Sequence, residues 1–229
     1  MNRKDITYEK AVTFSFDDGV AQDMQLVELF NRYGVKATFN LNTGIQSPES
    51  RFEIEGVPIH RMEQEGLDKL YAGHEIALHG LTHASPSELT VRQYEEEFLQ
   101  DARNIEKLYG KYPVGMAYAY GDAPDAVVEY LRSIDIYYGR TVESSYGFSL
   151  PKDLMRLAPT CHQNDERVFA LAEEFLERQS EEPMLFYVWG HSYEFDVHHT
   201  WEHMEKLLQI ISGKSDVFYG TNAECLGFV

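Results

Sequence analysis

Short apolar runs typical of buried strands alternate with helix-like segments along the whole chain of 229 residues. Strands are predicted at residues 11–16, 35–41, 75–79, 115–120, 136–142, 184–190 and 217–221. Helices are predicted at residues 22–33, 63–71, 90–105, 124–134, 165–179 and 200–211, with irregular excursions at 44–59 (a possible hairpin) and 143–157. Strands separated by helices indicate a parallel sheet, which an open doubly wound fold and a closed barrel both satisfy.

The position of the polar side chains favours the barrel. The candidate functional residues each follow a predicted strand: Asp17 and Asp18, Asn42, His79, Tyr120, Arg140, His191 and Asn222. Side chains from so many strand ends converge on one point only when the sheet closes or nearly closes. We therefore predict an α/β fold, a distorted (β/α)7 TIM-like barrel, with residues 1–229 forming a single domain.

Composition narrows the classes of function. The formal net charge is −18, which disfavours binding to nucleic acid or to anionic membrane surfaces. No apolar run approaches the ~20 residues that cross a bilayer, and the N-terminal residues lack the apolar core of a signal peptide. The two cysteines cannot build a disulfide framework. A cytoplasmic protein is expected.

Two clusters suggest a catalytic metal site. Asp17 and Asp18 end the first predicted strand, and although Asp and Gly are ordinary turn residues, adjacent carboxylates at a barrel mouth repel unless a cation or proton intervenes. Their side chains point in opposite directions along a strand, so they can take different roles. His79 and His83 follow the third strand, and with one carboxylate they would give three protein ligands and open positions, the pattern of a catalytic metal.

Other histidines have competing explanations. Residues 199–203 (HTWEH) match the inverted zincin signature, but Thr200 is predicted as a helix N-cap that leaves His199 outside the helix, so a solvated helix start is favoured. His191 follows a strong apolar strand and is either a core histidine or a catalytic acid or base. His162 either approaches the site from the loop after the fifth strand or is a hydrogen-bonded imidazole beside the free, buried thiol of Cys161.

The chain from about Val12 to His191 resembles the polysaccharide deacetylase family, the NodB-homology carbohydrate esterases of family 4. Residues 13–19 (TFSFDDG) are similar to the family's first motif, and residues 73–76 (GHEI) leading to 79–83 (HGLTH) to its second. The resemblance implies Asp17 as catalytic base and a divalent metal ion held by Asp18, His79 and His83. Zinc is the default ion for these ligand types, with cobalt, nickel and iron also compatible.

The later motifs depart from the family pattern. In residues 116–121 (MAYAYG), Ala117 takes the place of an arginine that orients the base in relatives, while Tyr120 keeps the position whose backbone N–H holds the oxyanion. In residues 189–191 (WGH), His191 keeps the place of the catalytic acid, and Trp189 replaces a leucine of the acyl pocket. Arg140 follows the fifth strand and could replace the missing arginine beside Asp17, the alternative being a surface arginine.

The predicted activity is metal-assisted hydrolysis of an N-acyl bond, most simply the acetamide of an amino sugar. The candidate substrate-binding residues are Arg140, Tyr118, Trp189 and His162, because aromatic side chains at strand ends offer faces for a sugar ring. Two alternatives stay open. The chain is another amide hydrolase of the same superfamily, acting on a small cyclic or linear amide, or it is a metal- and sugar-binding protein with little turnover.

Overall fold

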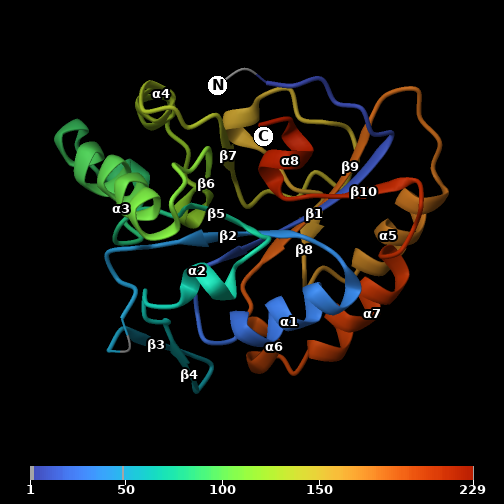
Figure 1. Cartoon of the computed structure of the whole chain (residues 1–229), viewed down its shortest axis with the longest axis horizontal. Helices are drawn as coiled ribbons and strands as arrows, with labels where there is room; N and C mark the ends of the chain where they lie inside the picture. The colour runs from blue at the N-terminus through green and yellow to red at the C-terminus, as the bar shows by residue number, and fades with distance from the viewer. Residues whose placement is uncertain (1–2, 48, 229) are drawn as a thin grey trace.

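An eight-stranded parallel sheet forms the centre of the computed structural model, which describes residues 3–47 and 49–228 (Figure 1). The strands follow the order β7-β6-β5-β2-β1-β9-β8, and β10 pairs with β1 off this path. Their bounds are β1 (Lys10–Asp17), β2 (Ala37–Leu41), β5 (Glu75–Leu78), β6 (Gly115–Ala117), β7 (Tyr138–Arg140), β8 (Cys161–His162), β9 (Met184–Gly190) and β10 (Val217–Tyr219). All eight residues of the central β1 are buried, as expected for a parallel strand covered on both faces.

The sheet curls until its two ends nearly meet, so the predicted distorted barrel is confirmed. Leu157 donates its N–H to the carbonyl of Gly139 and accepts a bond from the N–H of Thr141, at 2.8 and 2.9 Å. Three residues later, the N–H of Thr160 donates to the carbonyl of Tyr187 in β9. The segment 157–162 therefore bridges β7 and β9 and completes a ring of seven.

The prediction of residues 217–221 as the seventh barrel strand is wrong. β10 pairs only with Lys10, Ala11 and Val12 of β1, and β2 pairs with residues 14–17 farther along the same strand. β10 therefore stands outside the strand order that forms the barrel. The closing segment 157–162 was not predicted as a strand, because the irregular excursion ends at residue 157 and no element is predicted for residues 158–162. A two-residue strand is too short to show periodicity, so only its backbone pairing reveals its place.

Helices cover the outside of the barrel, with α1, α5, α6 and α7 along one side and α3 and α4 along another (Figure 1). Their bounds are α1 (Asp23–Tyr33), α2 (Leu67–Leu70), α3 (Gln100–Tyr109), α4 (Asp125–Ser133), α5 (Val168–Glu177), α6 (Glu194–Val197), α7 (Trp201–Ile211) and α8 (Asn222–Leu226). The short helices α6 and α8 were not predicted from the sequence, and α2 is shorter than the helix predicted at residues 63–71. None of the described helices is long and apolar enough to span a bilayer.

The helix predicted from Thr90 is broken into three pieces. A 3₁₀ turn (Val91–Gln93) and a π-helical turn (Glu95–Leu99) come before α3. The capping box of Thr90 and Gln93 is present. Val91, however, is 69% exposed and does not lie on the buried face, because the break changes which residues face the barrel.

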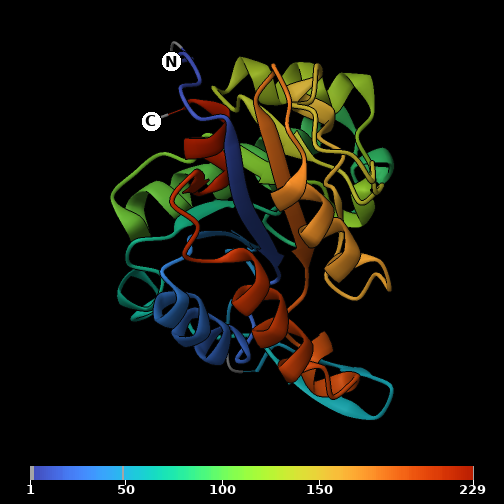
Figure 2. The same cartoon turned by 90° about the vertical axis from the view of Figure 1, so that its right-hand side faces the viewer.

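The excursion at residues 44–59 contains a hairpin, β3 (Arg51–Ile54) and β4 (Val57–His60). The hairpin extends from the barrel beside α6 (Figure 2), and the ring of Phe52 meets Tyr193 edge-on at 5.4 Å between centroids. Its return strand leads directly to Arg61, which is 8% exposed and lies inside the molecule. The hairpin thus delivers a buried cation to the carboxyl ends of the central strands.

Candidate active site and metal centre

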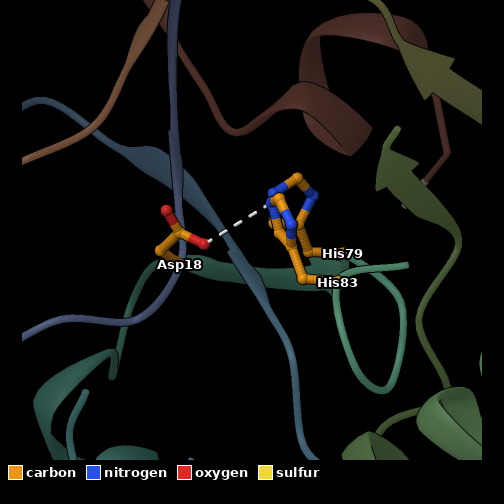
Figure 3. Close-up of side chains that lie close together, drawn as sticks. All are labelled: Asp18, His79 and His83. Carbon is orange, nitrogen blue, oxygen red and sulfur yellow. Dashed lines mark ion pairs between the residues drawn. The ribbon is translucent and has the colours of Figure 1, made fainter. Parts of the chain in front are cut away.

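Three side chains predicted as metal ligands converge at the carboxyl ends of the strands (Figure 3). Asp18 follows β1, His79 follows β5, and His83 lies in the next loop. Their potential ligand atoms all lie within 4.8 Å of one another. The distance from Asp18 Oδ1 to His83 Nε2 is 3.8 Å. Two imidazoles and one carboxylate are the donor set of a zinc-type catalytic site.

The hydrogen bonds of His79 fix the tautomer that a metal ion requires. Its Nδ1 lies 2.8 Å from the carbonyl oxygen of Ala117, which only accepts, so Nδ1 carries the proton. Nε2 therefore presents a lone pair, and this buried atom has no hydrogen-bond partner in the protein. Burial is the main cause that lowers the pKa of His83 to about 4, and the nearby His79 adds to this shift. The imidazole of His83 is therefore neutral at neutral pH. The residues fit a divalent ion.

Asp18 is held by Arg61, which belongs to none of the sequence motifs that indicated the site. Arg61 Nη2 lies 3.0 Å from Asp18 Oδ1, and Nη1 donates to the backbone carbonyl of Asp18. Burial would raise the pKa of Asp18, but His191 and Arg61 outweigh it and hold the pKa below its ordinary value. No local sequence pattern could have found Arg61, because its place depends on the path of the hairpin before it.

Asp17 is paired with Arg140, as predicted. Arg140 Nη2 lies 2.5 Å from Asp17 Oδ2, and Asn40 donates to Asp17 Oδ1 at 2.8 Å. Burial would raise the pKa of Asp17, but Arg140, His79 and His191 together lower it to about 2. Arg140 is 0% exposed and its guanidinium lies 4.4 Å from the ring centroid of Trp189. The alternative of a surface arginine is wrong, and Arg140 is not accessible for the predicted contact with substrate.

His191 faces both aspartates. Its Nε2 lies 3.9 Å from Asp17 Oδ2 and 4.0 Å from Asp18 Oδ2. Its Nδ1 lies 2.8 Å from Glu194 Oε1, in the first turn of α6. Burial would lower the pKa of His191, but the Glu194 carboxylate and the aspartates raise it. Glu194 was missed at the sequence level, although its spacing of three residues from His191 suits a helical turn.

His162 belongs to a second cluster with His191 and Glu194. Its Nδ1 accepts the N–H of Asn164 at 3.2 Å, so its Nε2 carries the proton and lies 3.4 Å from Glu194 Oε2. A metal ion at Nε2 would need the opposite tautomer. The cluster is therefore a hydrogen-bonded network, and it brings His162 edge-on to Trp189 beside the site, at 4.7 Å between ring centroids.

The two tyrosines after β6 have different environments. Tyr120 adopts a left-handed φ of 59°, is 68% exposed, and its ring meets His83 edge-on at 4.8 Å. Tyr118 is 1% exposed and belongs to a hydrophobic cluster that includes Phe98 and Val127. The predicted contact of Tyr118 with substrate is wrong, because its side chain points into the packing between the sheet and its helices.

The second histidine pair lies away from this site. Thr200 is the N-cap of α7, so His199 stays outside the helix, as predicted. His203 is exposed and its ring contacts Phe169 at 5.9 Å. Neither belongs to a potential metal cluster among the described residues. The predicted solvated helix start is confirmed.

Comparison with known proteins identifies the family. The model of the polysaccharide deacetylase family matches residues 4–139, more than half of the chain. The chain belongs to the polysaccharide deacetylase family. The matched segment contains Asp17, Asp18, His79 and His83, and ends one residue before Arg140.

Individual relatives of this deacetylase-family chain are distant. The Helicobacter pylori peptidoglycan deacetylase is 31% identical over 91 residues, which are 40% of this chain and 27% of that protein, so the match spans about a quarter of the relative. The family 4 carbohydrate esterase from Streptomyces lividans, solved with acetate, has a TM-score of 0.63 at 16% identity, covering 96% of this chain and 97% of that one. The Colletotrichum lindemuthianum chitin deacetylase has a TM-score of 0.63 at 17% identity, covering 97% and 90%. Both structures confirm the fold.

Proposed function

We propose that residues 1–229 form one catalytic domain that hydrolyses an N-acyl bond, most simply the acetamide of an N-acetylated amino sugar. One divalent ion, zinc by default and cobalt, nickel or iron as alternatives, would be held by Asp18, His79 and His83. The observation that carries the proposal is the buried Nε2 of His79, which has no hydrogen-bond partner and lies in a cluster with Asp18 and His83. The carboxylate of Asp17 lies 3.8 Å from this atom, and the imidazole of His191 lies 3.9 Å from that carboxylate.

The base in this proposal is Asp17. When bound, the ion would polarise the acyl carbonyl and make water more acidic. Asp17 accepts the proton of the attacking water, and Arg140 keeps the carboxylate ionised and fixed in orientation. Burial of both side chains makes this orientation rigid, so no reorganisation is needed when the proton is transferred.

The leaving nitrogen needs a proton, and His191 is placed to supply it. Glu194 holds Nδ1 of the imidazole and stabilises its protonated form, which leaves Nε2 directed at the aspartates. The backbone N–H of Tyr120 is the proposed donor to the oxyanion that forms when water adds to the carbonyl. Trp189 and His162, which lie side by side near His191, are the proposed contacts to the acyl or sugar portion of the substrate.

The alternative of a binding protein with little turnover rested on the alanine at position 117. Arg140 reaches Asp17 from β7 instead, so the guanidinium that relatives place elsewhere is still present. This contact supports an active enzyme. A small non-sugar amide stays the alternative substrate, because the described site contains no contact that selects a sugar.

The test combines metal content with product release. The purified chain should bind about one divalent ion, measured by elemental analysis, and release acetate from N-acetylglucosamine oligomers or N-acetylated peptidoglycan fragments. Asp17→Asn should abolish most of the release, while His203→Ala, on the exposed start of α7, should leave it unchanged. Release of a carboxylate from small amides and none from sugars would support the alternative substrate class. Metal and sugar binding without product from either would contradict an enzyme.

A further inference from the structure

The loop that carries His83 needs outside support. His83 has φ of 61°, a left-handed conformation that is uncommon for residues with a side chain. The loop contains no helix or strand of its own between His79 and Ala84. Its first carbonyls, of His79 and Gly80, both accept bonds from Asn42 Nδ2 at 2.8 Å. The half of the loop that contains His83 has to be held by another group.

That group is Glu97. Its carboxylate accepts three hydrogen bonds, from the N–H of Thr82 at 3.0 Å, the hydroxyl of Thr82 at 2.8 Å and the N–H of Ala84 at 3.2 Å. Its backbone carbonyl also accepts the N–H of Leu81 at 2.8 Å. The residues on both sides of His83 are thus bonded to one side chain, which is 4% exposed.

The π-helical turn Glu95–Leu99 presents this carboxylate to the loop. Phe98 is buried in the hydrophobic cluster that includes Tyr94, which anchors the turn against the barrel. The two preceding glutamates, Glu95 and Glu96, are exposed. π-helical turns occur often at functional sites, where one extra residue in a turn redirects a side chain. Here the redirected side chain is a buried carboxylate.

Gly80 shows how closely the loop approaches Glu97. A Cβ at this position would lie 2.6 Å from Glu97 Oε1, and its φ of 84° also disfavours any other residue. The contact between the turn and the loop therefore depends on a glycine. Glu97 has no contact of its own with the proposed ligand atoms, so it would act only through the loop backbone.

We propose that Glu97 is a positioning residue for the metal ligand His83. By bonding Thr82 and Ala84, it fixes the backbone on either side of the imidazole and keeps Nε2 near Asp18. The proposal rests on the metal site proposed above. Outer contacts that orient a ligand typically change metal affinity by about 10–100-fold when they are removed.

Two substitutions at Glu97 separate position from charge. Glu97→Met has a similar length and no acceptor, so zinc affinity, measured by competition with a chromophoric chelator, should fall by about 10–100-fold. Glu97→Gln also removes the negative charge, but its amide oxygen can accept both N–H groups and its NH₂ can donate to the Thr82 hydroxyl. Its affinity should stay close to that of the wild type. Glu96→Met, on the exposed side of the same turn, is the matched control and should have no effect.

A double-mutant cycle with His83→Ala tests whether Glu97 acts through His83. Once His83 is removed, Glu97→Met should cause no further loss of affinity. Visible absorption of the cobalt form should change in Glu97→Met and match the wild type in Glu97→Gln. If Glu97→Met does not fold, Thr82→Val removes one of the three bonds, and a loss of about tenfold is expected.

Several results would overturn this proposal. Unchanged affinity in Glu97→Met, or in Thr82→Val where Glu97→Met does not fold, would exclude a positioning role. An equal loss in Glu97→Gln would assign the effect to charge, and a loss that persists without His83 would indicate general destabilisation. If the wild type binds no zinc, or binds it independently of His83, the metal site itself is wrong and this proposal fails with it. Binding that needs His83 but ignores Glu97 leaves the metal site standing.

Discussion

Removing the charge of Arg140 should destabilise the folded, metal-free chain by about 3–5 kcal/mol at neutral pH, the usual cost of leaving one partner of a buried ion pair alone. Arg140 and Asp17 are 0% and 2% exposed, so water does not replace the lost partner. Arg140→Met keeps much of the side-chain length and the contact with the ring of Trp189. The main change is that the carboxylate of Asp17 stays buried without its cation.

The pH dependence provides the sharper test. In the wild type, the pKa of Asp17 is lowered from 3.8 to about 2, because Arg140, His79 and His191 outweigh burial. A shift of this size corresponds to about 2–3 kcal/mol of stability, present above about pH 4 and lost as the pH falls toward 2. Without Arg140, burial should raise the pKa of Asp17 above its unfolded value. In the variant, the stability that comes from protonated Asp17 is present at low pH and is lost as the pH rises through this raised pKa.

The deficit of Arg140→Met should therefore be largest at pH 7 and smaller at pH 4.5, both measured by urea unfolding followed by circular dichroism with a chelator present. Arg140→Lys, which keeps the charge, should lose less stability. Arg167→Met removes a half-exposed arginine from its pair with Asp165 and should cost no more than about 1 kcal/mol. A deficit of Arg140→Met that is below about 1 kcal/mol, or equal at the two pH values, would refute the reasoning.

Three further predictions concern the chemistry. Asp17→Asn should keep the metal and lower turnover by ~10²-fold or more, whereas Asp18→Asn should lose metal affinity first and recover activity partly in excess metal. Metal content and acetate release are measured side by side in both variants. The opposite pattern would reverse the two roles. His191→Ala should keep the metal and lose less activity on aryl esters than on amides, because a good leaving group needs no proton; equal losses would contradict an acid role. Glu194→Gln should move the alkaline limb of the pH–rate profile to lower pH, since the Glu194 carboxylate raises the pKa of an acid that must be protonated to act, and an unmoved limb would argue against this pairing.

Most of the strands and helices, and several residues of the candidate site, could be predicted from the sequence. Alternating apolar runs and amphipathic segments report local burial, and a parallel strand such as β9 remains apolar throughout because both of its faces are covered. Asp17, Asp18, His79 and His83 lie in short motifs at strand ends, so the backbone alone brings them to one edge. The contact of Arg140 with Asp17 was predictable for the same reason.

The supporting residues were decided only by the tertiary structure. Arg61 reaches Asp18 through the path of a hairpin, Glu97 faces the His83 loop because one turn is π-helical, and Glu194 holds His191 because a short helix follows β9. The barrel is closed by a segment whose only strand has two residues. None of these features has a periodic pattern. Hydrophobic periodicity records which face of a segment is buried, whereas the partner of a polar side chain depends on where separate loops meet, and that is set by the packing of the whole chain.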